Sequence, residues 1–272
     1  MNFAVFAVAL YFAIELTNDI FIIEEDPAMN DTSLQAVQLL LERQQSYIDL
    51  MNLMGRYQYL HTGGQMSVIG RELFAYDRPD SRCEYGPLGV FGPEKSLAFF
   101  DAMSELFTAG QGQCHPGLLE IHQITTPVLE VAGDNQTAKG LWMSTGAILM
   151  LHDGAAEEGR SFTWDTGKYA VDFIHTERGW KIWHLHVCDM WRASFDEDPV
   201  AHAGTLERGT TQAMIDAWNA KAAAGEEVRP HGMPVIPDGP TTFHYAYAAD
   251  SIAPQEPKAP VPYRTFSETF AY

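Results

Sequence analysis

Two histidines stand two residues apart in a strongly apolar segment. His184 and His186 lie within KYAVDFIHTERGWKIWHLHVCDMW, residues 168–191. A neutral imidazole can remove a proton next to a carbonyl group, because its pKa lies near neutrality. A tyrosine hydroxyl can donate a hydrogen bond to the oxygen on which negative charge develops, and this contributes most where water is excluded. Histidine and tyrosine together therefore suffice to eliminate water or to move a double bond.

The same segment is predicted to fold as a β-hairpin, because two β-rich runs flank the polar turn TERG. Alternation along a strand puts His184 and His186 on one face. A turn of two or four residues would set Tyr169 opposite His186, so that the tyrosine shares that face with both histidines. A turn of three residues would flip the pairing and bring Asp172 beside His184. The sequence leaves both registers open.

A long helix is predicted from Thr32 to about Leu60. Thr32 and Gln35 have the spacing of a capping box, and good helix formers follow them. Residues separated by four, seven and eleven positions lie on one face of such a helix. That face carries Leu50, Met54, Tyr57 and His61. The last two side chains are therefore expected to point into whatever the helix covers.

The remaining elements favour an α+β fold. A short helix in QMSVIGRELF and a strand in SRCEY precede a helix in GPEKSLAFFDAMSELF, which has Pro93 in its first turn. From His115 onward two long β-rich runs meet at the turn GDN, and the hairpin follows them. Helices first and antiparallel strands afterwards are typical of helices packed on one face of a sheet.

Composition argues against several classes of partner. The chain has 272 residues, 46% of them hydrophobic, which is enough for a substantial core. With 36 acidic against 17 basic side chains its formal charge is −19, and such a field repels phosphate backbones and anionic lipids. We therefore expect neither nucleic acid nor a membrane surface as a partner. Three cysteines without CxxC spacing favour neither a disulfide framework nor a thiolate zinc site, and they fit a reducing cytoplasm.

Three segments are predicted along the chain. Residues 1–30 form an N-terminal appendage, whose apolar run is too short to span a bilayer and lacks the basic region of a signal peptide. A secretory leader or a misassigned start is the alternative for these residues. Residues 31–192 form the α+β domain. Residues 193–272 are rich in proline and aromatic side chains without a period, so this tail is expected to pack on the domain or on a partner subunit.

The order of elements and several local sequences resemble the SnoaL-like branch of the nuclear transport factor 2-like superfamily. The similar stretches are LMGRYQYLH, GVFGPEKSLAFF, IHQITTPVLEVAGDNQTAKGLW, WDTGKYAVDF and GWKIWHLH, within about residues 34–192. The resemblance implies a cone like that of scytalone dehydratase and ketosteroid isomerase, in which a curved, mixed, mostly antiparallel sheet wraps around the N-terminal helices and a pocket lies between them. The convex face of such cones often forms dimers, so a homo-oligomer, a dimer or a trimer, is expected.

The resemblance also implies which side chains reach the pocket. The last two long strands of such a cone line it on the face that carries the isoleucine of GWKI, so His184 and His186 are expected to face the cavity. Tyr169 would join them across the ladder. His122 stands where relatives often place a pocket histidine, and Tyr57 matches the tyrosine that ends the helix.

The dehydratases of this superfamily pair a pocket histidine with tyrosines and an aspartate, and this chain departs from that pattern. His61 and Thr62 stand where the helix aspartate is usually found. Val171 replaces the aspartate that is common two residues after the tyrosine of GKY, and Asp172 lies one position further on. The identity of the base therefore stays open.

The sequence thus predicts a cofactor-independent lyase, and within that class a dehydratase, acting on a hydrophobic, oxygenated small molecule without a metal. The candidate catalytic residues are His122, His186, Tyr57 and His184. The candidate substrate-binding residues are His61, Tyr169, Trp142 and Asp172. Trp142 is more typical of packing. In the register that puts Asp172 on the convex face of the sheet, this residue would be a surface or interface carboxylate.

Three alternatives stay open. One is an isomerase of the same proton-transfer type, and another is a non-catalytic small-molecule-binding protein. In the third, His184 and His186 bind a metal ion with His122 as a third ligand. No nucleophile elbow, Walker loop or GxGxxG occurs in the sequence, so acyl transfer, phosphoryl transfer and nicotinamide binding lack support.

Overall fold

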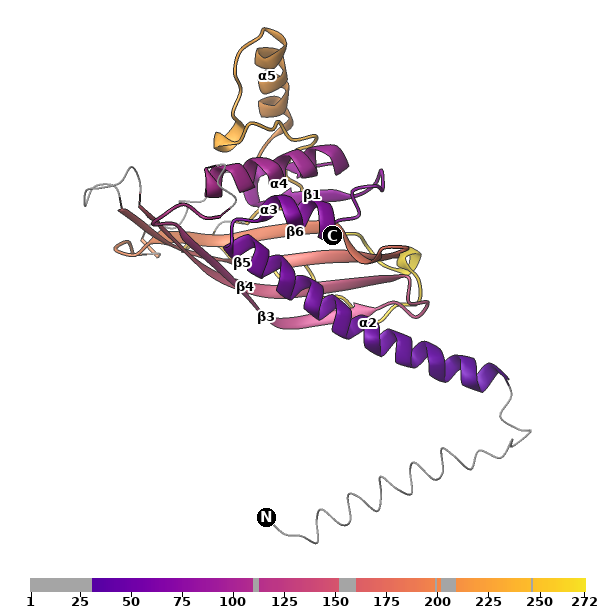
Figure 1. Cartoon of the computed structure of the whole chain (residues 1–272). Helices are drawn as coiled ribbons and strands as arrows, with labels where there is room; N and C mark the ends of the chain where they lie inside the picture. The colour runs from indigo at the N-terminus through magenta and orange to yellow at the C-terminus, as the bar shows by residue number, and fades with distance from the viewer. Residues whose placement is uncertain (1–30, 110–112, 152–159, 199, 202–208, 246) are drawn as a thin grey trace, which may run out of the picture. The chain divides into compact units, whose positions relative to one another are not determined.

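The protein is described by a computed structural model of two units, residues 1–42 and residues 43–272 (Figure 1). The first unit contributes residues 31–42, which begin helix α2 (Asp31–Thr62). The second contains the sheet and the other helices. The structure describes residues 31–109, 113–151, 160–198, 200–201, 209–245 and 247–272. The N-terminal appendage expected over residues 1–30 lies outside these ranges.

The helices of the second unit follow the signals in the sequence. Helix α4 (Pro93–Thr108) begins at Pro93, whose fixed φ and missing N–H suit a first turn. The predicted face of α2 is buried, because Leu50, Met54, Tyr57 and His61 are at most 1% exposed. The shorter helical segments are α3 (Met66–Val68), the π-helical turn η1 (Ile69–Leu73), the 3-10 turns η2 (Gly86–Leu88), η4 (Pro230–Gly232) and η5 (Phe266–Glu268), and helix α5 (Gln212–Ala223).

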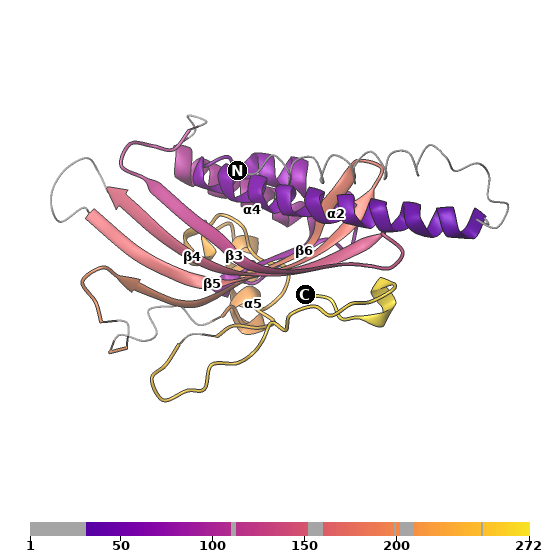
Figure 2. The ribbon, with the colours of Figure 1, turned by 90° about the horizontal axis from the view of Figure 1, so that it is seen from below.

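Six strands of the described chain form one sheet in the order β2-β1-β6-β5-β4-β3. β1 runs parallel to β6, and the other neighbouring pairs are antiparallel. Helix α4 and the part of α2 after residue 42 lie on one face of the curved sheet, and the C-terminal segment lies on the other (Figure 2). The predicted α+β fold with a curved, mixed, mostly antiparallel sheet is confirmed. The strands are β1 (Arg82–Tyr85), β2 (Val90–Phe91), β3 (Leu119–Val131), β4 (Thr137–Leu151), β5 (Arg160–Thr176) and β6 (Gly179–Ser194).

A β-bulge near the hairpin turn reverses the facing of the β6 side chains. The turn has two central residues, and Phe173 lies opposite Ile182, as that turn length predicts. The next pair, however, is Asp172 with His184, so Trp183 is an extra residue in the ladder. A shift of one residue moves every following side chain to the other face. The register expected for a two-residue turn is therefore wrong beyond this point.

A second bulge lies further along the same ladder. On β5, Asp165 and Gly167 are two positions apart, whereas their β6 partners Arg192 and Asp189 are three apart. One extra β6 residue is accommodated between these pairs. Asp189 and Arg192 consequently face the same side of the sheet, although strict alternation would put them on opposite sides.

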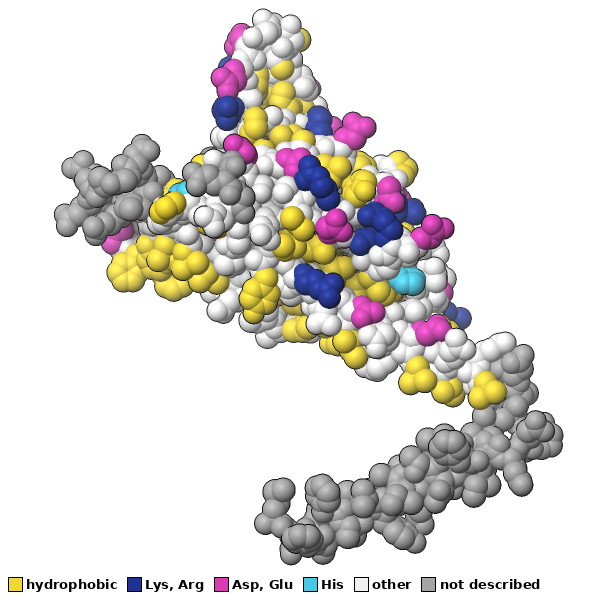
Figure 3. Space-filling model, in the orientation of Figure 1, with side chains coloured by type: hydrophobic (Ala, Val, Ile, Leu, Met, Phe, Trp, Pro, Cys, Tyr) yellow, Lys and Arg dark blue, Asp and Glu magenta, His cyan; other side chains and the backbone are white. Residues whose placement is uncertain are grey.

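Charged side chains are mixed on the surface of the protein. On the face shown in Figure 3, Lys and Arg side chains lie among Asp and Glu side chains rather than in a single basic patch. The guanidinium of Arg71 pairs with both carboxylate oxygens of Asp101, at 2.5 and 2.7 Å. None of the helices within the described ranges is long and apolar enough to cross a membrane.

Candidate active site

A cavity of about 360 Å³ lies between helix α4 and the sheet. Helix α4 contributes apolar side chains to its wall, among them Met103 and Phe107, and the tail contributes Met233. Tyr85 and Tyr169 also line it. A few convergent polar groups in a partly apolar hollow are typical of a small-molecule site. The charged and polar side chains of β3 to β6 that line it are Glu120, His122, Ser144, Asp165, Asp189 and Arg192.

Glu120 holds the imidazole of His122 in one orientation. The two residues are two apart on β3 and share a face, and Nε2 of His122 lies 3.0 Å from Oε1 of Glu120. When Nε2 carries the proton donated to this carboxylate, Nδ1 keeps its lone pair. Nδ1 lies over Gly146, the partner of His122 in the β3–β4 ladder. A Cβ at this glycine would overlap Nδ1 and lie 2.8 Å from Cε1, so the position requires a residue without a side chain.

The groups around His122 act on its pKa in opposite directions. Burial alone would lower the pKa of His122, but the hydrogen bond and negative charge of Glu120 outweigh burial and raise it. The charges of Asp165 and Asp189 add to this effect. Burial would raise the pKa of Glu120, but the neighbouring His61 and His122 lower it overall. The pair therefore combines a carboxylate whose pKa is lowered with an imidazole that this carboxylate makes more basic.

His61 of helix α2 lies against the same pair. Its ring centroid is 5.1 Å from that of His122 and 6.2 Å from that of Tyr57, and its Nε2 is 2.8 Å from the Tyr85 hydroxyl oxygen. Burial lowers the pKa of His61 to about 4, so this imidazole is neutral at pH 7. Among the described residues, Nδ1 of His61, the Tyr57 hydroxyl and Oε2 of Glu120 are buried without a hydrogen-bond partner. Such groups indicate a place for a ligand or water.

The tyrosines of the site are un-ionised hydrogen-bond donors. Tyr57 and Tyr169 pack edge to face, with ring centroids 5.9 Å apart. Tyr169 lines the cavity, whereas Tyr57 is fully buried beside it. Burial raises the pKa of Tyr57, Tyr85 and Tyr169 above the ordinary value for tyrosine. All three therefore keep their hydroxyl protons at neutral pH.

His61, Glu120 and His122 could also hold a divalent metal ion. One ligand atom from each of the three side chains lies within 4.8 Å of the other two. Two imidazoles and a carboxylate suit zinc or ferrous iron. The same three groups thus permit metal binding as well as proton transfer.

His184 and His186 lie on the opposite face of the sheet from the cavity. Tyr169 pairs with Val187, and both line the cavity, so the flanking positions of β6 point the other way. The expectation that these histidines face the cavity beside Tyr169 is wrong, because Trp183 bulges from the ladder. The metal arrangement that joined them to His122 is wrong for the same reason.

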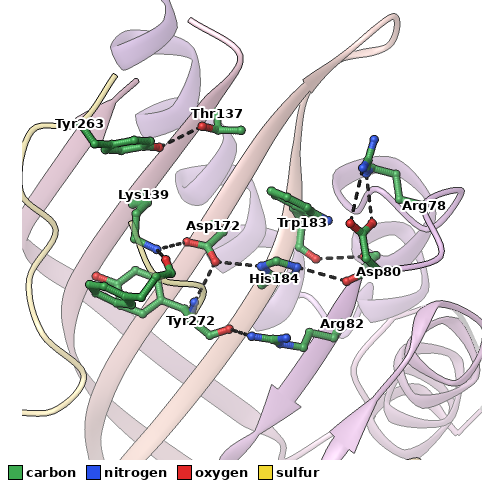
Figure 4. A network of polar contacts seen from close by, with 12 residues as sticks. Arg78, Asp80, Arg82, Thr137, Lys139, Asp172, Trp183, His184, Tyr263 and Tyr272 are labelled. Atoms are coloured by element: carbon green, nitrogen blue, oxygen red, sulfur yellow. Dashed lines mark hydrogen bonds and ion pairs between the residues drawn. The ribbon is translucent and has the colours of Figure 1, made fainter. Parts of the chain in front are cut away.

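The face away from the cavity carries a buried row of polar side chains across three strands (Figure 4). Asp172 pairs with Lys139 of β4 and accepts a hydrogen bond from Nδ1 of His184 at 2.8 Å. The tail completes the row, because Lys139 donates to the carbonyl of Phe270 at 2.6 Å and the Tyr272 amide donates to Asp172 at 2.8 Å. Lys139 and Asp172 are fully buried. Asp172 is therefore a tail-binding residue in this structure and not a lining residue of the cavity.

The tail also covers His186. The Nε2 of this histidine lies 3.2 Å from the carbonyl oxygen of Phe243 and 3.4 Å from Oε1 of Glu84. Glu84 accepts hydrogen bonds from the amide and hydroxyl of Thr242, at 2.7 and 2.5 Å. Trp142, the remaining predicted contact, is buried against Phe173 and does not line the cavity.

The sequence model of the SnoaL-like domain matches residues 43–186, more than half of the chain. The chain belongs to the SnoaL-like domain family. Most of the sheet and part of the cavity wall lie within these residues. Side chains beyond residue 186 also line the cavity, among them Asp189, Arg192 and Met233. No curated protein sequence matches the chain significantly.

Several solved structures are similar to this SnoaL-like protein in fold. A hexachlorocyclohexane dehydrochlorinase, LinA type 3, from Novosphingobium barchaimii is 15% identical, with a TM-score of 0.42 over 58% of this chain and 95% of that one. A putative scytalone dehydratase from Novosphingobium aromaticivorans is 10% identical, with a TM-score of 0.41 over 60% and 93%. A nuclear transport factor 2-like protein from Salmonella enterica is 15% identical, with a TM-score of 0.40 over 53% and 91%.

Sequence reasoning found the histidines and tyrosines around the cavity of the SnoaL-like domain but missed its charged groups. Glu120 had a usable signal, because a residue two positions before His122 on a strand must share its face. Asp189 and Arg192 had none, because only the bulge puts residues three apart on one face. Asp165 could not be identified either, because its role depends on its contact with Arg192, and the sequence does not show that contact.

Proposed function

We propose that this SnoaL-like protein is a cofactor-independent lyase that removes water from a hydrophobic, oxygenated small molecule. The observation that supports the proposal is the hydrogen bond between Glu120 and His122 inside a cavity with an apolar wall. An imidazole that a neighbouring carboxylate makes more basic and holds in place suits abstraction of a proton next to a carbonyl. The same proposal places the protein in the cytoplasm as a homo-oligomer, a dimer or a trimer.

The proposed step divides the work between the two sides of the site. Nδ1 of His122 takes the proton next to the carbonyl, while Glu120 stabilises the imidazolium that forms. The hydroxyls of Tyr85 and Tyr169 donate hydrogen bonds to the oxygen that becomes the enolate. The apolar side chains of helix α4 keep water away, which strengthens each of these interactions.

The test is the turnover of a β-hydroxy-β-phenyl ketone, whose dehydration gives a conjugated enone that is followed by its absorbance. The variant His122→Gln is expected to lose about 10²–10⁴-fold in kcat, because general base catalysis contributes that much, while ligand affinity stays within about threefold. His184→Gln is the matched control, since this histidine lies on the other face of the sheet. Equal turnover in wild type and His122→Gln would refute the mechanism.

A non-catalytic binding protein is the alternative from another class. It would show reduced ligand affinity in His122→Gln and no turnover of any carbonyl probe in the wild type. An isomerase would move the double bond of a β,γ-unsaturated ketone without releasing water. The two enzymes are distinguished by whether the product has lost the mass of water.

The spacing of His61, Glu120 and His122 favours one further candidate, a metal-dependent reaction. Metal analysis of the purified protein before and after chelation separates this candidate from the cofactor-independent lyase. Stoichiometric zinc or iron, together with loss of turnover on chelation, would replace the proton-transfer proposal. Turnover that survives chelation supports His122 as a free base.

A further inference from the structure

Asp165 and Asp189 share a single guanidinium group unequally at the polar wall of the cavity. Nη2 and Nε of Arg192 lie 2.5 and 3.2 Å from Oδ2 of Asp165. Nη2 is 3.8 Å from Oδ2 of Asp189, which is beyond hydrogen-bond distance. The arginine therefore neutralises Asp165 first. Asp189 is left beside a second negative charge with a more distant counter-charge.

The surroundings of Asp189 keep it shielded but within reach of a ligand. Its side chain is 14% exposed and lines the cavity, as does His122. Its carboxylate lies against Gly86 of η2, where a Cβ would overlap Oδ2. The charged and titratable groups that face it include Asp165 and Tyr169 of β5, Arg192 of β6 and His122 of β3.

These surroundings favour the protonated form of Asp189. Burial raises its pKa most, and the like charge of Asp165 raises it further. Arg192 and His122 act in the opposite direction, and the resulting pKa is about 7. When two neighbouring carboxyl groups have environments that push their pKa values apart, one can act as an acid while the other stays ionised.

We propose that Asp189 is the general acid of the elimination, donating its proton to the hydroxyl group that leaves the substrate. This inference rests on the proposed function and adds the second proton transfer that dehydration needs. Hydroxide is a poor leaving group, so an acid positioned at the departing oxygen lowers the barrier most for this class of substrate. The substrate class is therefore a β-hydroxy carbonyl compound.

The step balances within the site. The carbon-bound proton goes to Nδ1 of His122, and the electron pair of that bond forms the carbon–carbon double bond. The carbon–oxygen bond breaks with its electron pair going to oxygen, which takes the proton of Asp189 and leaves as water. The imidazolium of His122 then returns its proton to the Asp189 carboxylate through water in the cavity that both residues line. No oxidant or reductant is required.

The leaving group provides the test, because a carboxylate departs without being protonated. The full-length wild type, Asp189→Asn and His122→Gln are compared on the β-hydroxy-β-phenyl ketone and on its β-acetoxy analogue. Asp189→Asn is expected to lose about 10²-fold in kcat on the hydroxy ketone and less than about threefold on the acetoxy ketone. His122→Gln is expected to lose activity on both. Equal losses of Asp189→Asn on the two probes, or no loss on either, would overturn the assignment of Asp189, whereas full activity of His122→Gln would overturn the proposed function instead.

A measurement without turnover tests the same residue. The infrared difference spectrum between wild type and Asp189→Asn should show one carboxylic acid C=O band that disappears as pH rises through about 7. In Asp165→Asn the band should disappear at lower pH, because the like charge is gone and Arg192 can pair with Asp189. If the wild type turns over neither ketone, the spectrum alone tests whether Asp189 carries a proton. Absence of the band below neutral pH means that Asp189 holds no proton to donate, and the inference is then wrong.

Discussion

Oε1 of Glu120 lies 3.0 Å from Nε2 of His122, and the two residues stand two apart on one face of β3. Their mutual orientation is therefore fixed by the pleat of a single strand and not by the packing of separate elements.

Replacing Glu120 by Gln removes the charge that stabilises the His122 imidazolium. We expect kcat on the β-hydroxy ketone to fall about 10²-fold and the pKa of His122 to fall, because Glu120 is the main group that raises it. A folded-state pKa above the unfolded value stabilises the protein at low pH, and this stabilisation is lost as pH rises through it. In Glu120→Gln the free energy of unfolding should therefore not show this decrease with rising pH. NMR titration of His122 measures the change, with Glu177→Gln in the exposed turn as the control. An unchanged pKa would contradict the role of Glu120.

His61 should make the protein less stable in acid. Its folded pKa is about 4, below the value for an unfolded histidine, so the unfolded state binds more protons between about pH 6.5 and 4. The free energy of unfolding should fall by on the order of 3 kcal/mol as pH drops through this window. The variant His61→Gln should show a shallower slope in urea denaturation at each pH. His175→Gln, at an exposed position, should keep the wild-type slope.

Gly146→Ala should displace the His122 ring, because the new Cβ would overlap Nδ1. We expect a loss of kcat comparable with that of His122→Gln, measured on both ketones. Gly55→Ala is the control, since no atom lies within 4 Å of a Cβ at this helical glycine. That substitution should raise the free energy of unfolding by about 0.5–1 kcal/mol and leave kcat unchanged. Full activity of Gly146→Ala would mean that Nδ1 is not the basic atom.

Asp172→Asn should affect stability without affecting chemistry. The substitution leaves the buried Lys139 ammonium without its counter-charge, which costs about 3–5 kcal/mol of unfolding free energy. Chemical denaturation measures the loss, with the exposed Asp196→Asn as the control. The kcat of the folded fraction should stay at the wild-type value, because the row faces away from the cavity. A selective loss of kcat would show that the two faces are coupled.

Removing residues 263–272 should lower the melting temperature. The truncation takes away the Phe270 carbonyl and the Tyr272 amide that bind Lys139 and Asp172. Its effect should be less than additive with that of Asp172→Asn, because both changes remove the same interactions. Mass in solution, measured on the same samples, shows whether the segment also supports an oligomer. Unchanged melting would mean that the tail contacts contribute nothing to stability.

Much of the fold could be predicted because its signals are local. The helical spacing of Tyr57 and His61 and the turn residues between strands are properties of short segments, and the structure follows them. His61 and His122 meet because one lies on the buried face of a helix and the other on the covered face of a strand. The facing of β6 could not be predicted in this way, because whether Trp183 stays in the ladder depends on pairing with another strand. The arrangement of the three groups Asp165, Asp189 and Arg192 depends on the second bulge in the same ladder.

The extra residue at Trp183 also affects how β6 should be compared between relatives. A gapless alignment column assumes that equivalent positions share a face, and this strand breaks that assumption within one hairpin. In a relative without the extra residue, the histidines aligned with His184 and His186 would enter the pocket and lose their contacts with the tail. Insertion or deletion of one residue here would thus move the β6 side chains that face the cavity to the outer face of the sheet, and the outer side chains into the cavity. The flanking sequence would stay unchanged. Residue roles in this family are therefore best transferred by strand pairing and not by position in the sequence.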